Sequence, residues 1–147
     1  MTIDQGARNN EILIEACKDD NLDMLEQVLS TDNYIDINHT DGLGNSALHY
    51  AVKYASIGCL EIFLYYDGIN VNAINDVEGD TPLHKAAAHA DPEAALDMVQ
   101  ILVGKGASMK IQNKLNQTPL DVVPSGTHAE VKSWMETAAL SAKTGSA

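Results

Sequence analysis

The sequence predicts an all-α solenoid of stacked helix–turn–helix units with turns or short hairpins at their tips. The main evidence is a recurring segment, TPLHKAA at 81–87, which returns imperfectly as SALHYAV at 46–52 and TPLDVV at 118–123. Aligning these segments and ILIEAC at 12–17 on their leucines gives intervals of 35, 35 and 37 residues. Self-similarity at a period in this range is the signature of a repeat array.

A turn sequence of the type Asp/Asn-x-x-Gly precedes each repeat, more loosely in the last copy: DGLG at 41–44, DVEG at 76–79 and NKLN at 113–116. Gly44 and Gly79 fit turn positions with positive φ, which glycine adopts without steric cost. Thr81 can cap a helix with its side-chain oxygen, and Pro82 suits the first helical position because its missing N–H would be unpaired there anyway. We therefore expect each unit to consist of a tip, an inner helix, an outer helix and a return loop.

The period divides the chain into an N-terminal capping unit (1–40), a repeat (41–75), a repeat with a lengthened turn between its helices (76–112), a C-terminal capping unit (113–140) and a flexible tail (141–147). Apolar residues at spacings of three and four mark one face of each expected helix. In the first unit these are Leu13, Ala16, Leu22, Leu25, Val28 and Leu29. Because no unit can bury its own apolar face, the core is expected to run through stacked neighbours.

Two further features concern the outer helices. Pro92, in the sequence ADPE at 90–93, must begin or end a helix, because proline inside a helix removes a hydrogen bond and clashes with the preceding turn. A longer acidic turn is expected there, and a tolerated loop insertion is its simplest explanation. Tyr65 and Tyr66 are expected to cover the core from outside.

These motifs resemble the ankyrin repeat family over residues 10–125. The resemblance implies an array of about four units, in which His49 and His84 tie adjacent repeats together by hydrogen bonds to the backbone instead of acting in catalysis. It also implies that partners contact the turn tips and the exposed side of the inner helices, which together form a groove. Ala47 and Lys110 stand where the family has Pro and Asn, so the individual units are expected to be weaker than a consensus array.

Carried over residue by residue, the resemblance implies these partner-binding positions: Leu43, Asn45, Lys53, Tyr54, Val77, Glu78, Asp80, His89, Lys114, Leu115 and Gln117. Lys18, Asp19 and Ala88 hold further inner-helix positions. Tyr54 is the favoured centre of the interface, because tyrosine combines a large apolar face with a hydroxyl group that can pair or stay hydrated. Packing between neighbouring inner helices is its alternative role.

Asn38 and Asn72 fall in the return loops, where asparagines of ankyrin proteins are sometimes hydroxylated by an oxygenase. Asn72 is the candidate for modification, because Leu64 stands eight residues before it and resembles the preferred context. The alternative is that its side chain simply satisfies backbone groups of the loop.

The net charge of −12 is unevenly distributed. Residues 1–97 contain 18 Asp/Glu and 4 Lys/Arg, whereas residues 98–147 contain 3 and 5. Such acidity disfavours binding to DNA or RNA, because that affinity comes from Lys and Arg neutralising phosphates. It would attract a basic protein surface, although it can also simply keep the array soluble.

The remaining observations exclude other classes. No apolar run approaches the ~18 residues that a membrane span requires, and the start lacks the basic and apolar blocks of a secretory signal. Cys17 and Cys59 are expected to be buried and reduced, and no tight Cys/His set suggests a metal. No catalytic motif is present.

We therefore expect a non-catalytic, monomeric protein-binding module or adaptor of the cytoplasm or nucleus, without a cofactor. The alternatives are an acidic escort or inhibitor of a basic protein, and a regulatory part of an enzyme or larger assembly.

Overall fold

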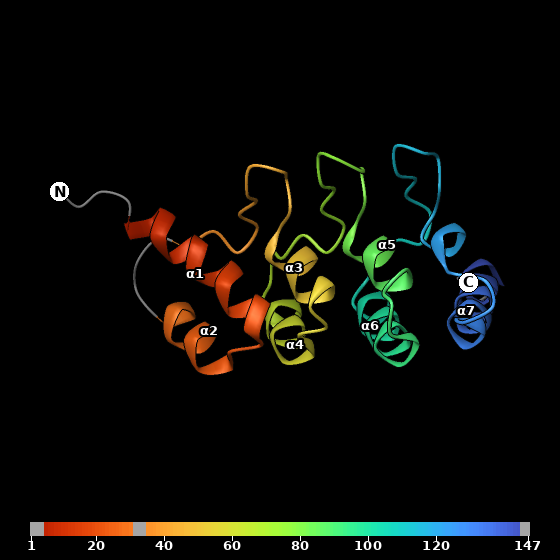
Figure 1. Cartoon of the computed structure of the whole chain (residues 1–147), viewed down its shortest axis with the longest axis horizontal. Helices are drawn as coiled ribbons and strands as arrows, with labels where there is room; N and C mark the ends of the chain where they lie inside the picture. The colour runs from red at the N-terminus through yellow and green to blue at the C-terminus, as the bar shows by residue number, and fades with distance from the viewer. Residues whose placement is uncertain (1–4, 31–34, 145–147) are drawn as a thin grey trace.

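The computed structural model describes residues 5–30 and 35–144 of the 147-residue chain, and its helices stack in a single row with the tips projecting from one side (Figure 1). The elements are α1 (Gln5–Asp19), α2 (Leu22–Leu29), α3 (Ala47–Lys53), α4 (Ile57–Tyr65), α5 (Pro82–Ala87), α6 (Pro92–Gly104), the 3-10 helix η1 (Leu120–Val122) and α7 (Ala129–Thr144). Over these described ranges, β pairing is limited to an isolated bridge between Thr40 and Ser46. The predicted all-α solenoid is confirmed.

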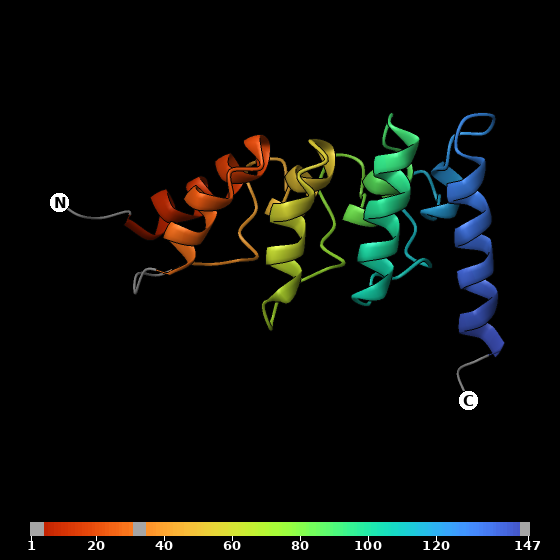
Figure 2. The ribbon, with the colours of Figure 1, turned by 90° about the horizontal axis from the view of Figure 1, so that it is seen from below.

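The stack has two layers. Helices α1, α3 and α5 form the inner layer beside the tips, and α2, α4, α6 and α7 lie behind them, where Figure 2 shows α4, α6 and α7 nearly parallel. The core runs through all four units without a break and includes Leu13, Leu25, Leu48, Leu60, Phe63, Leu83, Met98, Leu102, Val131 and Met135. Burial of apolar surface between units therefore holds the row together.

The inner helices begin where the sequence predicts. Ser46 and Thr81 are the N-caps of α3 and α5, and their hydroxyl oxygens accept hydrogen bonds from the backbone N–H groups of His49 and His84. In return, the imidazole Nδ1 of each histidine accepts from the backbone N–H of its cap residue, at 3.1 Å in both units. Pro82 occupies the first turn of α5 as predicted.

The outer helices are capped in two different ways. Asp91 caps α6 within its own unit, and Pro92 begins that helix as predicted. Ser56, the N-cap of α4, makes no side-chain cap bond. Instead Asp20 of the preceding unit accepts a 3.0 Å bond from the backbone N–H of Cys59, while the Ser56 hydroxyl donates to the carbonyl of Cys17. The start of α4 is thus built by two units together.

The closing unit differs from the expected helix pair. Its inner helix is reduced to the single 3-10 turn η1, because Pro124 has no N–H to donate and forces Val123 into an extended conformation (ψ 123°). The outer helix α7 continues to Thr144, past the boundary predicted at residue 140 and into the tail predicted to begin at residue 141. Residues 145–147 of that tail lie outside the described residues.

Three residues expected to cover the core do not. Leu22 begins α2 and is 39% exposed, with its side chain beside Gly58 of the next unit. Tyr65 ends α4 and is 82% exposed, and the next residue, Tyr66, is 38% exposed. The two rings meet edge-on with their centroids 6.4 Å apart. These side chains stand at helix ends, where the chain turns away from the core.

The prediction that both cysteines are buried is confirmed. Cys17 and Cys59 are fully buried free thiols in adjacent units. The neighbouring Cys59 thiol and burial together raise the pKa of the Cys17 thiol well above its usual value. None of the described helices is long and apolar enough to cross a membrane.

Candidate functional site

A groove of about 560 Å³ lies between the tips and the inner helices of the two central units. Its walls come from the tips before α3 and α5, and its floor from those two helices. The lining residues are Leu43, Asn45, His49, Tyr50, Lys53, Asn75, Val77, Glu78, Lys85, Ala88 and His89. A groove of this size can hold several side chains of a partner.

Each tip is folded around one side-chain oxygen at its base. Asp41 Oδ1 accepts from the backbone N–H groups of Leu43 and Asn45, at 2.9 and 3.0 Å. Asn75 Oδ1 accepts from Glu78 and Asp80 in the second tip, and Asn113 does the same for the third. Short polar side chains suit this role because they can bond backbone groups two or more residues on.

Consecutive tips are also joined to one another. The Asn75 amide donates to Asn45 Oδ1, and the Asn113 amide donates to Asp80 Oδ1, both at 3.0 Å. The backbone N–H of Asp76 adds a 2.9 Å bond to the carbonyl of Leu43. The walls of the groove are therefore held in place by bonds between units.

The two repeat histidines extend this network beneath the tips. His49 Nε2 lies 2.8 Å from the carbonyl oxygen of Asp80, and His84 Nε2 lies 2.8 Å from that of Gln117. Because each Nδ1 accepts from a backbone N–H, each Nε2 carries the hydrogen that is donated to the next unit. Burial lowers the pKa of His49, which keeps its ring neutral. The structural role that the family resemblance implies for these residues is confirmed.

The floor residues Tyr50 and Lys85 occupy equivalent places in successive units, two residues after the aligned leucine. The Tyr50 hydroxyl donates to Asp41 Oδ2, and this bond, together with burial, raises the pKa of Tyr50 to about 12. Lys85 Nζ lies 2.6 Å from Glu78 Oε1 and 3.6 Å from Asp80 Oδ2. Helices α3 and α5 thus each bond acidic residues of their own tips.

Burial acts to raise the pKa of the Asp41 carboxyl group, but the bonds from Tyr50 and from the backbone of Asn45 and Leu43 outweigh it and lower the pKa below its usual value. The pKa of Glu78 is also lowered, chiefly by its bond from Lys85 and then by that from Asn75. Both carboxylates therefore stay ionised at neutral pH.

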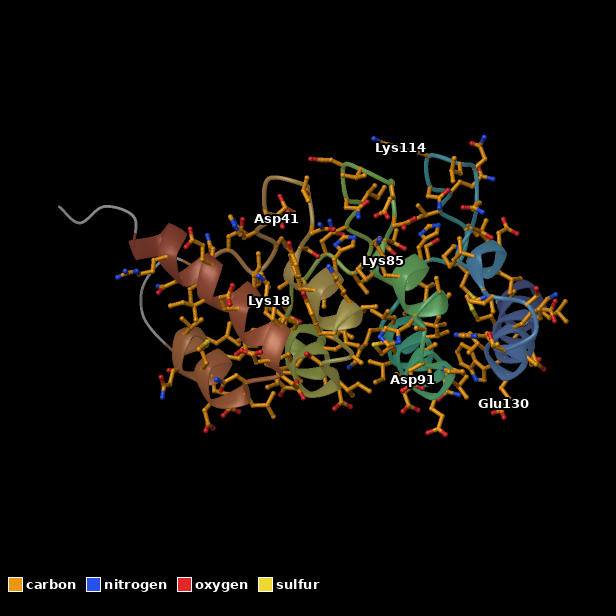
Figure 3. The ribbon with its side chains drawn as sticks, in the orientation of Figure 1. Lys18, Asp41, Lys85, Asp91, Lys114 and Glu130 are labelled. Carbon is orange, nitrogen blue, oxygen red and sulfur yellow. The ribbon has the colours of Figure 1, made fainter. Side chains whose placement is uncertain are left out.

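Two lysines of the inner layer lie over tyrosine rings. Lys18 of α1 is 5.5 Å from the centre of the Tyr50 ring, and Lys53 is 5.5 Å from that of Tyr54. Lys18 also pairs with Glu15 at 3.1 Å. Figure 3 shows Lys85 and Lys114 on the tip side of the molecule, whereas Asp91 and Glu130 point from the opposite edge.

The structure places six of the expected partner-binding residues on the groove: Leu43, Asn45, Lys53, Val77, Glu78 and His89. The other five, Tyr54, Asp80, Lys114, Leu115 and Gln117, lie outside its lining. Asn45 and Asp80 also accept the bonds that join consecutive tips. Leu43, Val77 and Leu115 project from successive tips and are 55, 59 and 76% exposed.

Tyr54, expected at the centre, instead follows the end of α3 as its C-cap, 46% exposed and beside Lys53. Tyr50, one turn earlier, lines the groove because it lies closer to the tip. Helical spacing could have identified Tyr50, since residues four apart share a face. His49, Lys85 and Asn75 were likewise not expected to line the groove, and the first of these was assigned only a structural role.

The asparagines of the return loops bond adjacent units. Asn72 Oδ1 accepts a 2.8 Å bond from the backbone N–H of Ser108. Asn38 Oδ1 accepts from Asn70, and its amide donates to the carbonyl of Gly68. These contacts support the alternative role of Asn72 in satisfying loop backbone groups, and its hydroxylation stays a prediction.

The part of the chain that the structure describes contains no group of three or more His, Cys, Asp or Glu side chains able to hold a metal ion.

The comparisons with known proteins agree with the repeat architecture. The family model for ankyrin repeats, in three copies, matches residues 13–113.

Individual relatives share the repeats to different extents. The chain is 39% identical over 129 residues to an ankyrin repeat-containing protein of Saccharomyces cerevisiae, covering 81% of this chain and 71% of that protein. It is 34% identical over 91 residues to the human NF-kappa-B inhibitor zeta, covering 59% of this chain and 12% of the inhibitor. A probable serine/threonine-protein kinase of Dictyostelium discoideum is 30% identical over 110 residues, covering 74% of this chain and 13% of the kinase. This chain belongs to the ankyrin repeat family.

Proposed function

We propose that this chain is a non-catalytic protein-binding module or adaptor whose partner occupies the groove between the tips and inner helices. The observation that carries the proposal is the 560 Å³ groove itself, with apolar side chains at its rim and charged side chains on its floor. Ankyrin repeats are interaction modules in general, and a few exposed apolar residues surrounded by polar ones are typical of an interface.

The walls of the groove are preorganised, which favours binding. The tips are fixed by the bonds of Asn75 and Asn113, and the floor is tied to the tips through Tyr50 and Lys85. A partner would therefore lose little free energy in ordering the site. We further propose that the module acts as a monomer in the cytoplasm or nucleus. The two buried free thiols support the compartment, because free cysteines are typical of a reducing environment.

A basic partner is a second proposal, and it rests on the net charge of −12. Many of the exposed carboxylates lie outside the groove, and Figure 3 shows Asp91 and Glu130 on the edge opposite the tips. A basic protein would accordingly bind along that edge, and its affinity would fall steeply with added salt. A third proposal is that the chain is a regulatory part of an enzyme or larger assembly. It is supported by the inhibitor and kinase relatives, in which the related segment forms only 12–13% of the whole protein.

The groove proposal is tested by affinity capture from the source cell with three forms of the chain. These are the natural sequence, the double variant Leu43→Ser/Val77→Ser at the rim, and Tyr65→Ser on the outer layer as a matched surface control. All three changes involve exposed side chains, so thermal unfolding should stay cooperative. We expect partners to be lost only with the rim variant. Partners that persist with it but disappear with Tyr65→Ser would contradict the proposal.

A further inference from the structure

We propose that the groove binds an extended peptide segment in which an acidic side chain lies next to an apolar one. The inference rests on the proposed function and specifies the chemistry of the partner. Charge is unevenly distributed around the array.

The first 97 residues contain only four basic residues, and three of them lie in or beside the groove. Arg8 is near the start of α1, whereas Lys53 and Lys85 line the groove and Lys18 covers the ring of Tyr50 on its floor. Only one acidic residue, Glu78, lines the groove. The groove lining is therefore weakly positive in a strongly acidic chain.

The three lysines in or beside the groove differ in whether they already form an ion pair. Lys85 is held by Glu78 and Asp80, and Lys18 by Glu15. Lys53, by contrast, has no ion pair among the described residues, and its ammonium group lies over the Tyr54 ring. A carboxylate entering the groove can pair with Lys53 without breaking an existing bridge, and a partly desolvated pair of this kind is stronger than an exposed one.

The acidic residues of the tips are less available to a basic ligand. Asp41 accepts from the Tyr50 hydroxyl, and Glu78 accepts from Lys85 and from the Asn75 amide. Asp80 accepts from the Asn113 amide and faces Lys85. A basic peptide in the groove would have to compete with these internal donors, which favours an acidic occupant.

The apolar part of the ligand is set by the rim. Leu43 and Val77 project from adjacent tips with more than half of each side chain exposed, above Tyr50 and Ala88 on the floor. An aliphatic or aromatic side chain placed between them would bury apolar surface on all partners. Lys53, which lines the same cavity, is then within reach of an acidic neighbour in the peptide.

The register of the repeats also predicts the spacing between two acidic residues of the bound peptide. Lys18 and Lys53 stand at equivalent positions, five residues after the aligned leucines, on the adjacent helices α1 and α3. Packed helices lie roughly 8–10 Å apart, and an extended chain of the polyproline II type advances about 3.1 Å per residue and returns to the same face every third residue. A second acidic residue about three positions from the first would therefore reach Lys18, whose exposed bridge to Glu15 contributes little free energy.

The test is selection of a phage-displayed library of random peptides, about 12 residues long so that an extended chain can pass along the groove. The full chain is compared with Lys53→Glu and with Lys132→Glu, which makes the same charge change at an exposed position of α7. We expect the natural chain and Lys132→Glu to enrich peptides with Asp or Glu beside an apolar residue. Lys53→Glu should lose that preference and weaken the best resynthesised peptide by about tenfold or more in fluorescence anisotropy.

The other outcomes separate the inference from the proposed function. Enrichment of basic peptides whose binding is lost in Leu43→Ser/Val77→Ser would overturn the acidic occupant and leave the groove function standing. Peptides that bind all variants equally would overturn both, because binding would then lie elsewhere. Failure to enrich any peptide with correctly folded chain would likewise count against both.

Discussion

His49 Nε2 lies 2.8 Å from the carbonyl oxygen of Asp80, although the two residues belong to different units. The same ring accepts the backbone N–H of Ser46 through Nδ1, so one neutral imidazole caps its own helix and bonds the next tip. Both sides of the groove therefore depend on the protonation state of this side chain.

We expect stability to fall on mild acidification because burial lowers the pKa of His49 below the ordinary histidine value of about 6.5. As the pH falls through about 6.5, the unfolded chain binds more protons at this site than the folded chain, so the free energy of unfolding decreases. Above that range the ring is neutral in both states and contributes no pH dependence. Urea unfolding at about pH 7.5 and about pH 5.5 measures the effect, and His49→Gln, though less stable, should show a smaller change between them. An equal pH dependence in both forms would contradict the assignment.

A graded glycine series tests how closely the tips pack. Gly44 has φ +79°, and a Cβ there would lie 2.7 Å from the backbone nitrogen of Asp76 in the next tip. We expect Gly44→Ala to cost about 2 kcal/mol from the strained φ and the clash. Gly68→Ala, with φ +86° but open space, should cost less, and Gly42→Ala should be nearly neutral. Equal chemical-denaturation midpoints for all three variants would show that the tips do not pack as described.

The cap that Asp20 provides to α4 joins the first two units. Asp20→Ala should cost about 1 kcal/mol, because the backbone N–H of Cys59 loses its acceptor. Asp20→Asn keeps an acceptor oxygen and tolerates the positive φ of 50°, so it should lose less. Asp19→Ala, at the exposed preceding position, serves as the control for charge. Thermal unfolding of the three variants measures these effects. Equal destabilisation of Asp19→Ala and Asp20→Ala would contradict the capping role of Asp20.

The bond from Tyr50 to Asp41 makes a further prediction for the floor of the groove. Tyr50→Phe should cost about 1 kcal/mol in unfolding free energy and should raise the pKa of Asp41 toward its usual value, since the hydroxyl donor is lost. Carboxyl NMR titration measures that pKa directly. Tyr65→Phe, with its ring 82% exposed on the outer layer, should change neither quantity. An unchanged Asp41 titration in Tyr50→Phe would disprove the bond.

The sequence was sufficient for the features that local rules determine. Thr81 and Pro82 start α5, and Gly44 and Gly79 adopt positive φ, because caps and turns depend on a few adjacent residues. It failed where distant residues decide the structure. The cap from Asp20 to Cys59 spans 39 positions, and no local pattern indicates it.

The closing unit could have been anticipated in part. Pro124 directly follows two β-branched residues and limits the inner helix to one 3-10 turn, although the repeat register alone suggested a full helix. In the groove, repeat alignment found the tips but favoured Tyr54 over Tyr50. The helix α3 is short, so the face that it turns to the groove depends on how its tip folds back. The bond between Tyr50 and Asp41 fixes that fold.

Site-specific photo-crosslinking in the source cell can show whether partners bind in the groove. A photoreactive amino acid is placed at Leu43 or Val77 on the rim, or at Tyr65 on the outer layer, all of which are exposed. We predict a covalent adduct to the same partner from both rim positions and none from position 65. Adducts formed only from position 65, or from no position, would contradict the claim.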